Sequence, residues 1–195
     1  MTTPLASAKS ILREQVRARL RTITEAERAT ASAQLCAQIL AQSIWKDTET
    51  VLLFSPIGDE PDIRPVIERC WQTGRRIAFL RHEVATQSYV ACVVKSDGEM
   101  MAGRFGVMEP TAGCPVVPLN QLDLVLAPGV AFDLTGLRLG RGKGFYDRLL
   151  AGVRGHKCGV AFDLQVVAQV PEEPHDVRVD SILTPTRWRL CRRAA

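Results

Sequence analysis

The sequence predicts a three-layer α/β domain in which helices cover both faces of a mostly parallel sheet. Short apolar runs typical of buried strands alternate along the chain with amphipathic segments typical of helices. The apolar run at 122–127 is unbroken and ends at Pro128 and Gly129, as expected for a strand covered on both faces. With 195 residues and 46% hydrophobic residues, the chain can bury one sizeable core, so we expect a single domain over residues 1–195.

Two helices are expected before the first strand, within residues 9–43, packed on the α/β core. Residues 9–21 carry apolar side chains on one side and basic side chains on the other. Thr24 and Glu27 have the spacing of a capping box, in which each side chain bonds to the other residue's backbone N–H, and this starts a second helix.

The remaining elements follow from periodicity and from the turn residues that bound them. We expect strands at 50–54, 76–80, 89–94, 122–127, 157–162 and 177–183, and helices at 63–73 and 145–153. Residues 98–121 are rich in glycine and proline and predict a long irregular connection. Because ligands bind beyond the carboxyl ends of strands in open α/β sheets, the turns after Phe54, Ala127 and Phe162 should share the functional edge.

Composition favours a small anionic ligand and gives no support for nucleic-acid or membrane binding. The net charge is +4 and the basic residues are spread along most of the chain, so no nucleic-acid groove is predicted. The six cysteines form no CxxC pair and there are only three histidines, which argues against zinc and for core thiols in a reducing compartment. The sequence shows neither a signal peptide nor an apolar run of membrane length, so we expect a cytoplasmic protein.

A glycine-rich basic loop between a predicted strand and a predicted helix is the main candidate site. It reads Gly140, Arg141, Gly142, Lys143, Gly144 and resembles neither a Walker loop nor a dinucleotide fingerprint in spacing. Such a loop is suited to binding phosphate, because it offers backbone N–H groups, two cationic side chains and the N-terminus of the helix that follows. The pattern alone is also compatible with a flexible basic turn.

Further candidates lie elsewhere in the chain, and each also has an ordinary structural explanation. Asp147, in the first turn of the predicted helix, could hold magnesium against phosphates or could only favour the helix N-terminus. Lys9 and Arg13 share a helical face and could bind one anion, or could be solvated. Glu60 follows a predicted strand, where its carboxylate could bind hydrogen-bond donors of a ligand or could belong to an ordinary surface turn. Phe54 and Ser55 flank the same turn and could line a ligand pocket. More distant aromatic candidates are Phe105, Phe132 and Trp188, although such residues are more often part of the core.

The loop and its surroundings resemble a known family. The segment LAPGVAFDLTGLRLGRGKGFYDRLL resembles the signature of the 5-formyltetrahydrofolate cyclo-ligase family, and KSILR, GDEPD, FGVMEP and PHDVRVD match it in the same order. The resemblance implies an architecture like that of the sugar-phosphate isomerase and CoA-transferase group. It also implies ATP- and Mg²⁺-dependent conversion of 5-formyltetrahydrofolate, a reduced folate, to 5,10-methenyltetrahydrofolate with release of ADP and phosphate.

The resemblance also implies roles for individual residues. Lys9 and Arg13 match residues that bind ATP, Glu60 a glutamate that contacts folate, and Asp176 a second carboxylate associated with magnesium. Phe145 stands where many relatives have tyrosine, which removes a hydroxyl. The predicted site is therefore catalytic Arg141 and Lys143; metal-binding Asp147 and Asp176; substrate-binding Phe54, Ser55, Glu60, Phe145 and Tyr146; and ATP-binding Lys9, Arg13, Gly140, Arg141, Gly142, Lys143, Gly144, Tyr146 and Asp147.

Two other functions remain open from the sequence. An isomerase of phosphorylated sugars on a similar scaffold would need no ATP. A non-catalytic nucleotide-binding protein would bind without turnover. For the cyclo-ligase we expect a monomer that binds ATP and a reduced folate.

Overall fold

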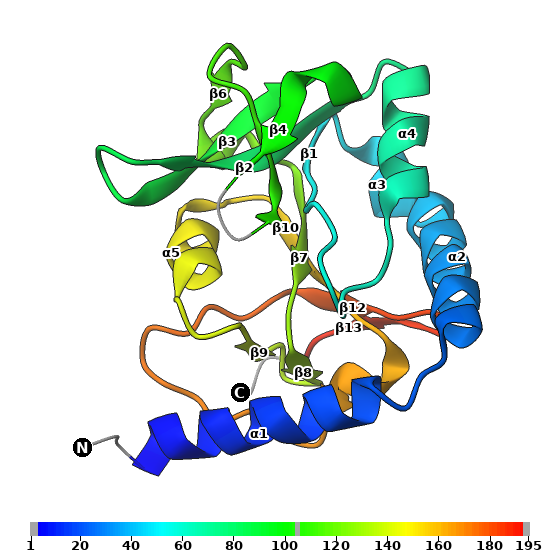
Figure 1. Ribbon diagram of the computed structural model, residues 1–195, viewed down its shortest axis with the longest axis vertical. Coiled ribbons are helices and arrows are strands. Elements are labelled where there is room, and N and C mark those ends of the chain that lie inside the picture. Colours follow the sequence, from blue (N-terminus) through cyan, green and yellow to red (C-terminus); the bar gives the residue numbers. More distant parts are fainter. Residues whose placement is uncertain (1–3, 104–105, 193–195) are drawn as a thin grey trace.

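The computed structural model describes residues 4–103 and 106–192 (Figure 1). The helices are α1 (Pro4–Leu20), α2 (Glu25–Ala41), α3 (Ser43–Asp47), α4 (Arg64–Gln72) and α5 (Phe145–Gly152). The strands are β1 (Thr50–Leu52), β2 (Arg76–Glu83), β3 (Ser88–Val94), β4 (Met100–Ala102), β5 (Met108–Pro110), β6 (Val116–Val117), β7 (Leu124–Pro128), β8 (Ala131–Asp133), β9 (Arg138–Leu139), β10 (His156–Val160), β11 (Val166–Val167), β12 (Ser181–Leu183) and β13 (Trp188–Leu190).

An eight-stranded sheet in the order β13-β12-β10-β7-β1-β2-β3-β6 forms the centre of the molecule. Its strands β12, β10, β7, β1 and β2 are all parallel, whereas β13, β3 and β6 add antiparallel strands at the two edges. The mostly parallel sheet is thus confirmed. Since β1, β7 and β10 are parallel neighbours, the turns that follow them leave the same edge of the sheet, as predicted.

Helices cover both faces of this sheet and give three layers (Figure 1). On one face, buried residues of α2, α3 and α4 pack with strand residues such as Val51, Ile77 and Leu126 in one hydrophobic cluster. On the other face, Leu149 and Leu150 of α5 pack with Leu52 and Val125. Alternate residues of β1 therefore face opposite helical layers, which explains why its neighbouring residues Val51 and Leu52 are both apolar.

The N-terminal helices both form and end within two residues of the predicted positions. The capping box is confirmed, because the Glu27 N–H donates to Thr24 Oγ1 at 3.2 Å and the Thr24 N–H donates to Glu27 Oε2 at 2.8 Å. The first helix begins earlier than predicted, at Pro4, because proline is tolerated in a first helical turn. Val16 and Leu20 of α1 pack on a small separate sheet of β11, β8 and β9.

The expectation of an irregular connection at 98–121 was wrong in part. Strands β4 and β5 form an antiparallel hairpin, and β6 joins the main sheet beside β3. Strands of two or three residues are too short for an alternating pattern to show in the sequence. The C-terminal strand β13 was missed for the same reason.

The cysteines are mostly core residues, as predicted. Five are buried and Cys191 is partly exposed, and all six are free thiols. Burial raises the pKa of Cys36 and of Cys70 to about 11, so these thiols remain protonated near neutral pH. No helix among the described residues is long and apolar enough to cross a membrane.

Candidate active site

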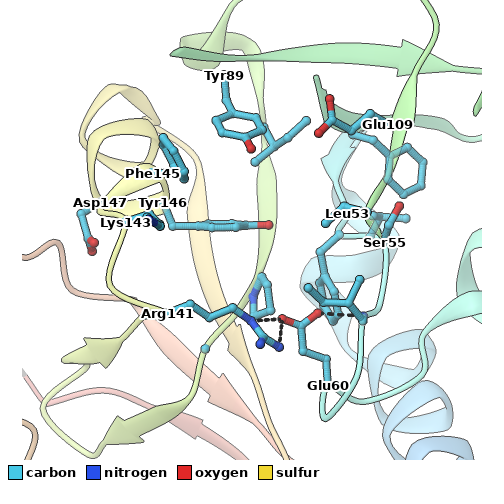
Figure 2. A pocket seen from close by; sticks show the side chains of 18 of the residues that line it. Leu53, Ser55, Glu60, Tyr89, Glu109, Arg141, Lys143, Phe145, Tyr146 and Asp147 are labelled. Carbon is cyan, nitrogen blue, oxygen red and sulfur yellow. Dashed lines mark hydrogen bonds and ion pairs between the residues drawn. The ribbon is translucent and has the colours of Figure 1, made fainter. Parts of the chain in front are cut away.

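A cavity of about 420 Å³ opens where β1 and β7 end, between the glycine-rich loop and the β4–β5 hairpin (Figure 2). Ten of the residues predicted for the site line it: Phe54, Ser55, Glu60, Gly140, Arg141, Lys143, Gly144, Phe145, Tyr146 and Asp147. The predicted residues Lys9, Arg13, Gly142 and Asp176 do not line it. Its walls are mainly apolar, with a few polar groups, as is usual for a small-molecule site.

The loop enters α5 through glycines in left-handed conformations. Gly142 has a φ of +100° and Gly144, the N-cap of α5, has a φ of +63°. A side chain would strain both positions, so the spacing of these glycines follows from the backbone path. Arg141, which precedes Gly142, and Lys143, which lies between the two glycines, are exposed. A hairpin formed by β8 and β9 connects β7 to the loop, which the sequence did not predict.

Arg141 joins the loop to the turn that carries Glu60 (Figure 2). Its Nη2 donates to Asp59 Oδ1 at 2.7 Å and to Glu60 Oε1 at 3.1 Å. The second oxygen of Glu60 accepts a hydrogen bond from the Ile57 N–H at 3.1 Å. Burial raises the pKa of Glu60, and the positive charge of Arg141 opposes this rise. The predicted phosphate-binding and folate-binding residues are thus in direct contact.

Asp147 forms a buried ion pair with Arg138, a residue that sequence reasoning missed. Arg138 Nη2 donates to Asp147 Oδ1 at 2.9 Å, and the two side chains are 3% and 12% exposed. The guanidinium of Arg138 also lies 5.2 Å from the centre of the Tyr146 ring, in a cation–π arrangement. The sequence did contain a sign of this pair. Arg138 lies between Leu137 and Leu139, and a charged residue in a buried segment needs a partner of opposite charge.

Helix α1 contacts the loop through Arg13, whose Nε donates to the Gly140 carbonyl at 2.8 Å. Lys9 is buried at 7% exposure, and its Nζ donates to Asp176 Oδ2 at 2.6 Å and to Glu173 Oε2 at 2.7 Å. Lys9 therefore already binds two carboxylates, of which Glu173 was not predicted.

Two groups of side chains could take part in metal binding. Glu173, His175 and Asp176 place possible ligand atoms within 4.8 Å of one another, but Lys9 bonds to two of the three. Asp147 belongs to the separate Arg138 pair. Metal binding by Asp147 and Asp176 stays a prediction.

Aromatic side chains form one wall of the cavity. Phe145 packs edge-on against Tyr89, with ring centres 4.8 Å apart, and Tyr89 was not predicted for the site. Burial raises the pKa of Tyr146, so its phenol keeps its proton, and Figure 2 shows its hydroxyl pointing into the cavity. On the opposite wall, Ser55 Oγ donates to the Met108 carbonyl at 2.9 Å.

Two of the more distant aromatic candidates do not join this wall. Phe132 is a fully buried core residue. Trp188 stacks on His156, away from the residues that line the cavity. Phe105 lies outside the described residues.

Glu109 was also missed, although it lies within the FGVMEP segment. It lines the cavity from β5, and its side chain contacts the end of β2 because the His82 N–H donates to Glu109 Oε2 at 2.9 Å. Its sequence context, between Met108 and Pro110, gives no sign of burial.

Comparison with known proteins identifies a family. The sequence model of the 5-formyltetrahydrofolate cyclo-ligase family matches residues 5–185. The 5-formyltetrahydrofolate cyclo-ligase of Escherichia coli K12 is 30% identical over 177 residues, covering 88% of this chain and 97% of that protein. The protein of the same name from Mycolicibacterium smegmatis is 31% identical over 186 residues, covering 92% and 95%.

Comparison with solved structures leads to the same family. The NMR structure of Aquifex aeolicus 5,10-methenyltetrahydrofolate synthetase superposes with a TM-score of 0.86 at 34% identity, covering 96% of this chain and 94% of that one. A 5,10-methenyltetrahydrofolate synthetase from Mycoplasma pneumoniae has a TM-score of 0.72 at 22% identity, covering 91% and 98%, and supports the fold alone.

Proposed function

Because the chain belongs to the 5-formyltetrahydrofolate cyclo-ligase family, an enzyme family, we propose that it converts 5-formyltetrahydrofolate to 5,10-methenyltetrahydrofolate while ATP is converted to ADP and phosphate. One observation supports this proposal above the others. A loop suited to phosphate and a turn suited to folate face one cavity and are joined by Arg141. A ring closure driven by phosphoryl transfer needs both substrates at one place.

The chemistry explains why the two sites must adjoin. The formyl oxygen on N5 is a poor leaving group, so direct ring closure with loss of water is slow near neutral pH. Transfer of the γ-phosphoryl group to that oxygen makes it a good leaving group. N10 then forms a bond to the formyl carbon and loses its proton, and the carbon–oxygen bond breaks to release phosphate. The protein's task is to align the two substrates and to stabilise charge on the moving group.

The loop residues carry most of this task. Lys143 and Arg141 neutralise charge on the transferred phosphoryl group, and the backbone N–H groups of residues 140–144 bind phosphate oxygens. Arg13 fixes the loop through the Gly140 carbonyl, and Lys9 contributes to ATP binding from the same helix. Phe54, Ser55, Phe145 and Tyr146 enclose the pterin, and Glu60 contacts the substrate from the turn that Arg141 joins to the loop.

Magnesium fits this loop chemically. Exposed cations and glycines in left-handed conformations suit a triphosphate, and Asp147 supplies a carboxylate beside them. We propose that Mg²⁺ would be held by the carboxylates of Asp147, which also pairs with Arg138, and of Asp176, which bonds to Lys9 outside the cavity lining; when bound it would reduce the charge on the phosphates. The enzyme would act as a monomer in the cytoplasm on these two small substrates.

The test is to mix the protein with 5-formyltetrahydrofolate, ATP and Mg²⁺ and to follow the absorbance of the methenyl product. We expect the absorbance to rise only when all three are present. Turnover of phosphorylated sugars without ATP would instead indicate an isomerase. Nucleotide binding without any turnover would indicate a binding protein.

A further inference from the structure

Glu109 is a buried carboxylate with one unused oxygen. The residue is 6% exposed, and its Oε2 accepts the hydrogen bond from the His82 N–H. Its Oε1 is also buried and has no hydrogen-bond partner among residues 4–103 and 106–192. A buried carboxylate oxygen without a partner is costly, so such a group usually has a ligand or a role in chemistry.

The Glu109 side chain is held in a fixed position. Besides the bond from His82, it packs directly against Gly103, where an added Cβ would lie 2.5 Å from Glu109 Cδ. The glycine thus leaves the space that the carboxylate group occupies. Figure 2 shows the Glu109 carboxylate directed toward the cavity, at the end where Tyr89 lies. Fixed orientation is what a specificity residue needs.

Glu60 and Glu109 lie at opposite ends of the cavity. Figure 2 shows Glu60 beside Arg141 at one end and Glu109 beside Tyr89 at the other. Glu60 already accepts hydrogen bonds on both oxygens, from Arg141 and from the Ile57 N–H. Oε1 of Glu109 accepts none from the described residues. We therefore expect the two carboxylates to contact different parts of one ligand.

The geometry of a reduced pterin decides which part each can take. The formyl group is on N5, at one end of the fused rings, while the 2-amino group and N3–H form the opposite edge. Phosphoryl transfer requires the formyl end to face Arg141 and Lys143. The edge with the 2-amino group and N3–H must then point away from the loop, toward Glu109. Two parallel N–H donors match the two oxygens of a carboxylate.

We propose that Glu109 binds the 2-amino and N3–H edge of the reduced folate and selects for this edge, while Glu60 contacts the reacting end. This inference rests on the proposed function, since it takes the orientation of the pterin from the reaction. It assigns substrate recognition to a residue of the β4–β5 hairpin, apart from the glycine-rich loop and the Glu60 turn.

Equilibrium binding of 5-formyltetrahydrofolate without ATP tests the inference directly. In Glu109→Gln the amide oxygen can still accept from the His82 N–H, but its NH₂ group replaces the acceptor that faces the ligand. We expect a Kd about ten- to a hundredfold higher, typical of losing a charge-assisted hydrogen bond. The ATP affinity and the melting temperature should stay near those of the parent protein. A Kd within twofold of the parent value would overturn the inference.

A matched control and an analogue separate recognition from a structural role. Glu99→Gln alters a carboxylate that also accepts a backbone hydrogen bond, from the Lys95 N–H at 2.7 Å, but lies outside the cavity lining. It should bind folate normally. A 2-desamino analogue should bind the parent protein and Glu60→Gln at least about tenfold more weakly than the natural substrate, but Glu109→Gln should no longer discriminate. Equal discrimination by Glu109→Gln would contradict the inference.

These results are independent of turnover. If the parent protein binds folate through Glu109 but forms no methenyl product, the proposed reaction fails and the recognition stands. If product forms but Glu109→Gln binds folate normally, the recognition fails and the reaction stands. If Glu109→Gln does not fold, weak binding of the desamino analogue to the parent protein supports the inference, and undiminished binding overturns it.

Discussion

Replacing Asp147 with asparagine should destabilise the protein far more than a helix-end substitution. The Arg138–Asp147 pair is almost fully buried, with an Nη2–Oδ1 distance of 2.9 Å. Removing one partner of a buried pair leaves an uncompensated charge and costs about 3–5 kcal/mol. Losing only a favourable charge at a helix N-terminus costs about 0.3–1 kcal/mol. Because asparagine keeps one acceptor oxygen for Arg138, we expect a cost of about 3 kcal/mol, at the lower end of this range.

Thermal and urea unfolding measure this cost. For a chain of this length, about 3 kcal/mol lowers the Tm by roughly 6–12 °C. Adding Arg138→Met to Asp147→Asn removes the stranded charge and should restore much of the lost stability. A Tm within about 2 °C of the parent value for Asp147→Asn, or a double variant no more stable than the single one, would refute the reasoning.

The same variant tests whether Asp147 holds magnesium. If it does, activity at a temperature where the variant is folded should fall, and added Mg²⁺ should partly restore it. Titrating magnesium at fixed ATP compares the two proteins directly. Coincident curves would show that the metal is held elsewhere and that Asp147 serves Arg138 alone.

Three further predictions concern the loop and the Glu60 turn. Lys143→Ala should lower turnover about a hundredfold with an unchanged melting temperature, because the side chain is exposed; near-normal turnover at saturating ATP would refute its role. Glu60→Gln should weaken folate binding but leave ATP affinity in the free enzyme unchanged, whereas equal losses for both ligands would indicate a structural turn residue. Burial raises the pKa of Glu60, so its carboxylate is protonated at higher pH than an ordinary glutamate. Folate affinity should therefore weaken as the pH falls through that pKa, and this acidic decline, measured by titration at several pH values, should be absent in Glu60→Gln.

The fold was largely predictable because its main elements have local patterns. The capping box at Thr24 and Glu27 and the unbroken apolar run at 122–127 both identified their elements. The short strands β4, β5, β8, β9 and β13 had no such pattern. Their hydrogen bonds depend on partners that only the folded chain brings near.

The residues that line the cavity were predictable where several of them belong to one continuous segment, as in the glycine-rich loop. The ion pairs were not, because their members are far apart in the sequence. Lys9 and Asp176 are separated by 167 residues, and Arg141 and Glu60 by 81. Glu109 was missed because its unusual property is a buried oxygen without a hydrogen-bond partner among the described residues, and the sequence does not show burial. Sequence patterns identify a residue's chemistry but not its tertiary partners.

The stoichiometry of ADP and methenyl-folate formation is the most direct test of the proposed reaction. In quenched samples containing 5-formyltetrahydrofolate, ATP and Mg²⁺, we expect equal amounts of both products at every time point. We also expect no ADP when the folate is omitted. Methenyl product without ADP, or ADP release that does not depend on folate, would contradict a reaction that couples the two substrates in this cavity.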